Sequence, residues 1–184
     1  MSVTLTTFVI VSAGIVAVSW RSLRHWRSHG FYRFFALESL LVLILLNAAS
    51  WFVDPFCTRQ IVSWSLLTGS TALALHGFYL LRRFGKPGGE SIRLSTNLPL
   101  ENTSTLLVAG AYKHIRHPLY ASLILLVWGV YLKQPSLLGS LSALAATAFL
   151  YTTAIAEERE NHQRFGEEYE AYVAKTKRFI PFVF

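Results

Sequence analysis

Four long stretches of the chain are almost free of charged residues, and they constrain the fold more than any other feature. They are residues 3–20, 34–53, 61–81 and 137–156, with 18, 20, 21 and 20 residues, and the only charge among them is Glu38. A helix of about 20 apolar residues spans the roughly 30 Å hydrocarbon core of a bilayer. The strands of a membrane barrel need only about ten residues of alternating character. The runs therefore predict an all-α, polytopic membrane protein.

A fifth uncharged run, residues 119–132, is shorter and lies close to the last of the long ones. Its 14 residues are separated from residues 137–156 by a connection of four residues that contains Pro135. Proline blocks helix continuation because it lacks a backbone N–H, and two helices joined by so short a connection lie antiparallel. We therefore expect about five transmembrane helices, the last two forming a helical hairpin, in a single membrane domain over residues 1–184.

The distribution of basic residues predicts the orientation of these helices. Three groups of 4, 6 and 5 Lys and Arg, together 15 of the chain's 17, fall in segments that five helices place on one side of the membrane. Only Arg59 and Lys133 fall on the other side. Cytoplasmic loops carry an excess of Lys and Arg. We therefore expect a multi-pass protein of a bacterial or archaeal plasma membrane with a cytoplasmic C-terminus.

Composition excludes several other classes of protein. The 184-residue chain is 53% hydrophobic and 15% charged, whereas a soluble domain has about 25% charged residues. Cys57 is the only cysteine, which excludes a disulfide framework and a four-cysteine zinc site, and we expect no metal. No zinc-finger, helix-turn-helix or RNA-binding pattern accompanies the net charge of +7. We therefore expect membrane lipids as partners and no nucleic acid.

The last part of the chain has the pattern of a helix outside the bilayer. Phe165, Tyr169, Tyr172 and Val173 recur at helical spacing. This predicts a cytoplasmic amphipathic helix, which Pro181 would end. The expected domain then has four parts: three membrane helices in 1–81, a cytoplasmic connection in 82–118, the hairpin in 119–156 and a cytoplasmic C-terminal segment in 157–184.

Residues 110–120, with the sequence GAYKHIRHPLY, place histidines, bases and tyrosines at the cytoplasmic start of the fourth run. Pro118 suits the first turn of a helix, which puts His117 at the N-cap. A helix N-terminus offers free N–H groups and the positive end of the helix dipole to a carboxylate or phosphate. Arg116 could add a bidentate contact. An ordinary interfacial helix start, with Arg116 extending toward the membrane surface, explains the same residues equally well.

Glu157 and Glu158 directly follow the last uncharged run. The antiparallel hairpin brings this end beside the start of residues 119–132, so we expect the two carboxylates to meet His117. Ionisable groups at the end of a membrane helix are either functional or simply solvated. The expected meeting with His117 favours the functional interpretation.

Four short motifs follow one another in the second half of the chain: RHPLY at 116–120, EE at 157–158, FGEEY at 165–169 and RFIP at 178–181. In this order they resemble the isoprenylcysteine carboxyl methyltransferase family, which overlaps with the phospholipid N-methyltransferases. The resemblance implies an integral membrane methyltransferase that uses S-adenosylmethionine as cofactor. The acceptor would be a lipid or small molecule carrying a carboxylate, amine or thiol. The sequence has no G-x-G-x-x-G fingerprint, which fits because such enzymes lack a Rossmann domain.

The resemblance also implies roles for individual residues. The catalytic residues would be Arg116, His117, Glu157 and Glu158. The cofactor-binding residues would be Ser104, Thr105, Leu106, Leu107, Tyr112, His117, Pro118, Leu119, Tyr120 and Glu157. The C-terminal segment would close the pocket, and a lipid acceptor would enter sideways between helices. An acceptor that loses a proton would need a base, for which His114, Glu157 and Glu158 are candidates.

Two positions depart from the family's pattern. Ser122 stands where the family often has glycine, which predicts a more crowded cofactor channel. Thr153 stands where the eukaryotic prenylcysteine enzymes have an arginine that holds the substrate carboxylate. The sequence therefore favours methyl transfer without favouring a prenylcysteine acceptor. Two alternatives remain: an NADPH-dependent membrane reductase of the sterol-reductase type, and a membrane scaffold without catalytic activity.

Overall fold

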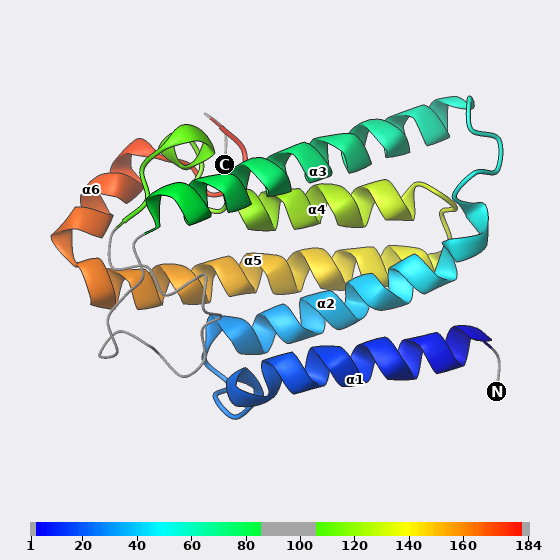
Figure 1. Ribbon diagram of the computed structural model, residues 1–184, viewed down its shortest axis with the longest axis horizontal. Coiled ribbons are helices and arrows are strands. Elements are labelled where there is room, and N and C mark those ends of the chain that lie inside the picture. The colour runs from blue at the N-terminus through cyan, green and yellow to red at the C-terminus, as the bar shows by residue number, and fades with distance from the viewer. Residues whose placement is uncertain (1–2, 86–105, 182–184) are drawn as a thin grey trace.

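The computed structural model describes residues 3–85 and 106–181, and their regular structure is helical (Figure 1). The α-helices in chain order are α1 Val3–Leu23, α2 His29–Leu46, α3 Thr58–Phe84, α4 Pro118–Tyr131, α5 Leu137–Phe165 and α6 Glu167–Lys175. Two short 3-10 helices, η1 Ala48–Ser50 and η3 Gly110–Lys113, lie in the connections. These two ranges of the chain contain no β-strand, and the all-α prediction is confirmed.

Among the described residues, four helices are long and apolar enough to cross a membrane. They are α1, α2, α3 and α5. The apolar helix α4 has 14 residues, which corresponds to about 21 Å at 1.5 Å per residue. That is shorter than a hydrocarbon core of roughly 30 Å. The described part of the chain thus has the helices of a multi-pass membrane protein.

The helices lie side by side along the long axis of the molecule (Figure 1). α2 packs against α5, α3 packs against α4, and α1 packs on the outer side of α2. α4 and α5 also pack against each other, antiparallel, so the predicted hairpin is confirmed. Ala143, Ala146 and Ala154 of α5 are fully buried. Such small side chains let helices approach closely within a membrane.

The second helix differs from the uncharged run 34–53 at both ends. It begins at His29 because the Ser28 side chain caps it by accepting a 3.2 Å hydrogen bond from the Phe31 backbone N–H. It ends at Leu46 because the chain turns at Asn47, whose buried amide donates to the Leu43 carbonyl at 2.9 Å. An uncharged run indicates which residues can face lipid, whereas the hydrogen bonds of the capping residues determine where the helix starts and ends.

The prediction for the C-terminal helix was wrong in its bounds. α5 continues past the uncharged run to Phe165, and the chain then turns at Gly166, which has φ of +54° and ψ of −128°. This backbone conformation favours glycine. The separate helix α6 begins at Glu167 and ends at Lys175, well before Pro181. α6 is amphipathic as expected, since its aromatic side chains are buried and its acidic ones are exposed.

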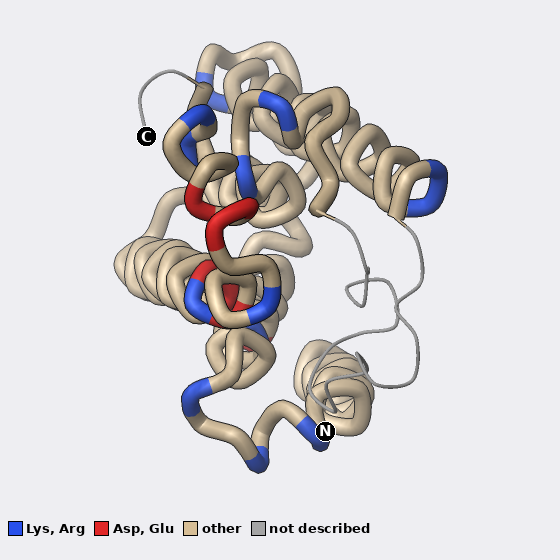
Figure 2. The backbone as a smooth tube through the Cα atoms, turned by 90° about the vertical axis from the view of Figure 1, so that its left-hand side faces the viewer, with Lys and Arg blue, Asp and Glu red and all other residues tan. Residues whose placement is uncertain are grey.

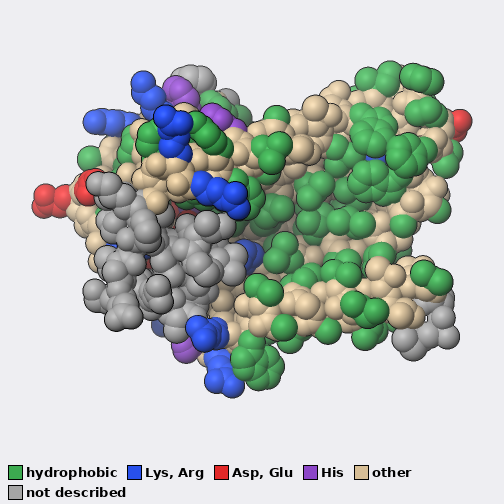
Figure 3. Space-filling model, viewed as in Figure 1, with side chains coloured by type: hydrophobic (Ala, Val, Ile, Leu, Met, Phe, Trp, Pro, Cys, Tyr) green, Lys and Arg blue, Asp and Glu red, His purple; other side chains and the backbone are tan. Residues whose placement is uncertain are grey.

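Basic residues gather at one end of the bundle. The α1–α2 connection, the end of α3, the start of α4 and the end of α5 all lie at this end, together with α6 (Figure 1). Figure 3 shows Lys and Arg side chains there on the face in view, while hydrophobic side chains cover much of the rest. Figure 2 looks onto this end and shows basic and acidic positions close together. We call it the charged end.

Two of the described basic residues, Arg59 and Lys133, lie at the opposite end of the bundle. Lys133 is fully buried, and its Nζ donates to Gln60 Oε1 at 2.9 Å and lies 3.5 Å from the centroid of the Trp64 ring. Arg59 Nη1 donates to the Leu132 carbonyl at 2.9 Å. Both side chains therefore hold connections together instead of standing as free surface charges.

Candidate active site

A short stretch of backbone pairing joins two of the sequence motifs at the charged end. The Arg116 N–H donates to the Lys177 carbonyl at 2.8 Å, and the Lys177 N–H donates to the His114 carbonyl at 3.0 Å. The His117 N–H donates to the Arg178 carbonyl at 3.1 Å. The segment before α4 and the segment after α6 thus lie parallel, with a bridge between Ile115 and Lys177. This pairing was not predicted from the sequence.

The carboxylate of Glu158 connects three basic side chains. Its Oε1 accepts from Arg116 Nε at 2.9 Å and from Arg178 Nε at 3.0 Å, and its Oε2 accepts from Arg178 Nη2 at 2.7 Å. His117 Nε2 lies 3.3 Å from Glu158 Oε1. The hydrogen bond to this carboxylate raises the pKa of Arg178 above its ordinary value. Charge-assisted hydrogen bonds of this kind are among the strongest in proteins. Glu158 therefore holds α5, the start of α4 and the C-terminal segment together.

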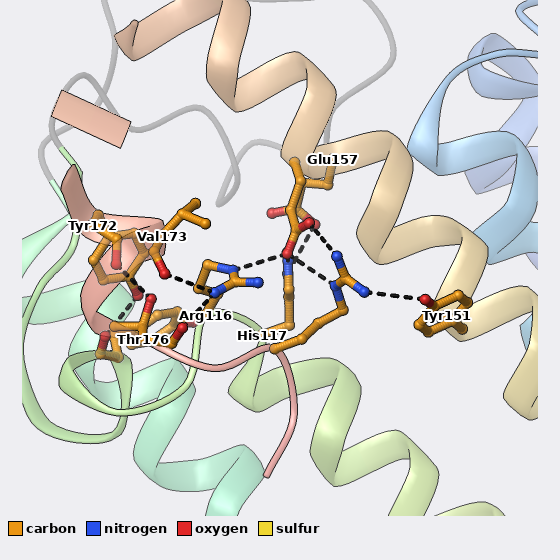
Figure 4. Close-up of polar contacts among 10 residues, drawn as sticks. Arg116, His117, Tyr151, Glu157, Tyr172, Val173 and Thr176 are labelled. Carbon is orange, nitrogen blue, oxygen red and sulfur yellow. Dashed lines mark hydrogen bonds and ion pairs between the residues drawn. The ribbon is translucent and has the colours of Figure 1, made fainter. Parts of the chain in front are cut away.

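Arg116 also caps the end of α6. Its Nη1 donates to the Thr176 carbonyl at 2.6 Å and more weakly to the Val173 carbonyl at 3.4 Å (Figure 4). A cation at a helix C-terminus satisfies free carbonyl groups and complements the negative end of the dipole. The polar contacts of Arg116 thus run to protein atoms on two elements.

His117 occupies the N-cap of α4, with Pro118 in the first turn, as the sequence predicted. Its imidazole stacks on the Tyr120 ring, with centroids 5.4 Å apart and 18° between the planes. Its Nδ1 lies 3.8 Å from Glu157 Oε2 (Figure 4). The buried imidazole therefore lies between the two carboxylates of α5, as the hairpin argument predicted.

A cavity opens beside this cluster. It contains about 790 Å³ of empty space when the space at its open mouth is included. Its wall includes eight of the predicted cofactor-binding residues together with Arg116: Leu106, Leu107, Tyr112, His117, Pro118, Leu119, Tyr120 and Glu157. Glu158 is not part of the wall. Ser104 and Thr105 lie outside the described residues.

Six further residues of the wall were not predicted. They are Leu81, Asn161, Arg164, Phe165, Tyr169 and Tyr172. Three of them follow Glu157 along α5 at spacings of four, seven and eight residues, which is one face of a helix. That spacing could have identified them, had α5 been extended past residue 156.

Two tyrosines of α6 close the inner wall of the cavity. The Tyr172 hydroxyl donates to the Tyr112 carbonyl at 2.6 Å and so fixes α6 to η3. The Tyr169 Oη is buried and makes no hydrogen bond within the described part of the chain. Burial raises the pKa of both phenols above their ordinary value, so both remain neutral and protonated.

The positions that depart from the family's pattern lie away from the cavity wall. Ser122 is buried, its Oγ donates to the Leu119 carbonyl at 2.7 Å, and its own carbonyl accepts from Ser70 Oγ at 2.7 Å. The Ser122 hydroxyl is thus engaged within its own helix, and Ser122 does not line the cavity. Thr153 is fully buried in the bundle, and its Oγ1 donates to the Phe149 carbonyl. The candidate base His114 is exposed and does not line the cavity.

These features define a helical membrane protein in which the RHPLY segment, Glu157 and two aromatic residues of the FGEEY segment line a partly enclosed cavity at the charged end of the bundle. The sequence profile of the phospholipid methyltransferase family matches residues 58–168, more than half of the chain. The chain belongs to this family of membrane methyltransferases. No curated protein and no solved structure matches the chain.

Proposed function

We propose that the chain transfers the methyl group of S-adenosylmethionine to a lipid or small acceptor at the cytoplasmic face of the membrane. The observation that carries this proposal is the cavity in which the RHPLY segment meets Glu157. Family membership supports the reaction class. The isoprenylcysteine carboxyl methyltransferase-like motifs support the same use of cofactor.

The residues of the cavity fit this cofactor. Small-molecule sites have a few polar groups in a largely apolar wall, and the leucines, aromatic rings and few polar side chains of this cavity wall have that character. The Glu157 carboxylate is 30% exposed and offers acceptors and a negative charge to a cationic ligand. Tyr120, Phe165 and Tyr172 offer aromatic surfaces. When bound, S-adenosylmethionine supplies an electrophilic methyl group on a sulfonium centre.

The chain's own contribution is binding and alignment. Methyl transfer of this kind needs an acceptor held in line in a site with little water. Glu157 and His117 would form the polar wall against which the ligand is oriented. Glu158, with its hydrogen bonds to Arg116 and Arg178, would act as a positioning residue that holds that wall in place.

The acceptor decides whether a base is required. A carboxylate acceptor needs none, whereas an amine, thiol or hydroxyl must lose a proton. Glu157 is the better candidate for that role because it lines the cavity. Glu158 is already engaged by two guanidinium groups and the imidazole. Membership of the phospholipid methyltransferase family favours a lipid acceptor.

Ligand binding tests the proposal directly. S-adenosylhomocysteine should bind detergent-purified protein in calorimetry with a dissociation constant in the micromolar range, about −8 kcal/mol. His117→Ala should weaken binding by about tenfold or more, whereas Tyr131→Phe, at the opposite end of the bundle, should leave it unchanged. Binding of NADPH in place of S-adenosylhomocysteine would identify the reductase alternative. Transfer of labelled methyl groups into a membrane lipid extract would then identify the acceptor.

A further inference from the structure

The hydroxyl of Tyr169 is the one polar group of the described cavity wall that is buried without a hydrogen-bond partner in the described chain. The residue is 1% exposed. Buried hydroxyl groups in native proteins are nearly always hydrogen-bonded, and each exception needs an explanation, such as a missing ligand. The position of Tyr169 on a cavity makes a ligand the natural explanation.

Packing fixes the position of this hydroxyl. The Tyr169 ring packs edge-on against His162, with centroids 4.9 Å apart, and against Tyr172 at 6.0 Å. Its backbone N–H donates to the Gly166 carbonyl at 3.1 Å, in the turn that separates α5 from α6. The side chain is therefore held from both sides, and the hydroxyl does not reach bulk water.

The groups around the hydroxyl define what it can bind. Glu157 and Asn161 lie one helical turn apart on α5 and line the same cavity. Burial, followed by the negative charge of Glu158, raises the pKa of Tyr169, and Glu157 adds to the effect. The side chain of Asn161 acts in the opposite direction and lowers the pKa of Tyr169. A neutral phenol beside a carboxylate presents lone pairs to an incoming donor.

We propose that Tyr169 Oη, the Glu157 carboxylate and the Asn161 amide form one polar subsite that receives the N–H or O–H donors of the cofactor. This inference rests on the proposed function. The donors available on S-adenosylmethionine are the α-ammonium group of its amino-acid part and the hydroxyls of its ribose. The negative charge of Glu157 disfavours a carboxylate or phosphate at this subsite.

Calorimetry with two ligands separates these donors. S-adenosylhomocysteine carries both, whereas 5′-methylthioadenosine has the ribose and lacks the amino-acid part. Tyr169→Phe, which removes only the hydroxyl, should lower the affinity for S-adenosylhomocysteine by about three- to tenfold, which corresponds to the loss of one hydrogen bond. An unchanged affinity for 5′-methylthioadenosine assigns the subsite to the ammonium group. An equal loss for both ligands assigns it to the ribose. Tyr131→Phe is the matched control. The Tyr131 hydroxyl lies 3.0 Å from Ser140 Oγ, far from the cavity.

Thermal unfolding without ligand provides a second readout. The Tyr169→Phe protein should melt at or above the wild-type temperature, because the substitution removes an unsatisfied buried hydroxyl. A lower melting temperature would mean that the hydroxyl supports the fold. In that case the half-buried Asn161 decides the matter. The inference stands if Asn161→Ala weakens the binding of S-adenosylhomocysteine at wild-type stability, and it is overturned if Asn161→Ala leaves that binding unchanged.

The inference and the proposed function fail in different ways. Wild-type affinity of Tyr169→Phe for both ligands overturns the subsite and leaves the proposed function intact. Failure of the wild-type protein to bind S-adenosylhomocysteine at all overturns the proposed function first.

Discussion

Glu158 Oε2 accepts a 2.7 Å hydrogen bond from Arg178 Nη2, and Oε1 of the same carboxylate accepts a 3.0 Å bond from Arg178 Nε. This bidentate pair joins the charged end of α5 to the segment that follows α6. Arg116 binds the same carboxylate from the start of α4. A single side chain thus connects three parts of the chain that are far apart in the sequence, and it does so behind the cavity wall.

Glu158→Gln should destabilise the protein and weaken ligand binding together. The substitution leaves two guanidinium groups without their counter-charge, and loss of one partner of a largely buried pair costs several kcal/mol. With Arg178 partly exposed, we expect a loss of about 2 kcal/mol in the free energy of unfolding. Thermal unfolding measures it, with Glu168→Gln on the exposed face of α6 as the control. Equal melting temperatures for the two variants would contradict the connecting role of Glu158.

Glu157→Gln should give the opposite pattern, with wild-type stability and weaker binding. Glu157 lines the cavity, and its Oε2 lies 3.8 Å from His117 Nδ1, which is beyond hydrogen-bond distance. Replacing the carboxylate by an amide therefore breaks few contacts within the protein. We expect S-adenosylhomocysteine affinity to fall by about tenfold, the loss of one charge-assisted hydrogen bond. If binding is unchanged while stability falls, Glu157 is a structural residue.

Gly110→Ala should destabilise the charged end, whereas Gly14→Ala should not. Gly110 has φ of +54°, and a Cβ added there would lie 2.7 Å from both His76 Nε2 and Leu80 Cδ1. Strain and the clash together should cost about 2 kcal/mol. Gly14 lies in α1 with nothing within 4 Å of the added Cβ, so alanine there should stabilise the helix by up to about 1 kcal/mol. Chemical or thermal unfolding compares them, and equal effects would contradict the tight packing of η3 on α3.

The charged end should face the cytoplasm. The native Cys57 precedes α3 at the opposite end of the bundle and is partly exposed. In intact cells a membrane-impermeant maleimide should therefore label wild-type protein. In a Cys57→Ser background, Trp26→Cys should be protected in intact cells, because residue 26 lies in the α1–α2 connection at the charged end. Residue 26 is 62% exposed, so the same cysteine should be labelled once the cells are opened. Labelling of this cysteine before the cells are opened would reverse the orientation.

The features of the fold that depend on the composition of long segments, such as the positions of the membrane helices, could be predicted from the sequence. The uncharged runs identified the membrane helices, and the short connection with Pro135 identified the hairpin. The start of α2 could not be predicted in the same way, because Arg33 is buried within the helix and interrupts the run. Its end depends on hydrogen bonds that the backbone and side chain of Asn47 donate to the last turn of the helix, and these leave no periodic signal in the sequence.

The candidate site was predicted only as far as its motifs extend. The RHPLY segment and Glu157 lie on the cavity, as the hairpin required. Asn161 and Tyr169 were missed because their positions depend on the extension of α5 and on the turn at Gly166. The pairing between Ile115 and Lys177 covers too few residues to leave a pattern of alternation.

That pairing also imposes an order in time on the assembly of the site. Ile115 and Lys177 are separated in the chain by α4, α5 and α6, and closing so long a loop is slow unless the intervening chain is already folded. We therefore expect the two segments to meet only after α5 has folded back along α4. A chain whose hairpin has not yet formed would then lack both the Glu158 connection and the cavity wall that α4 and α5 build together.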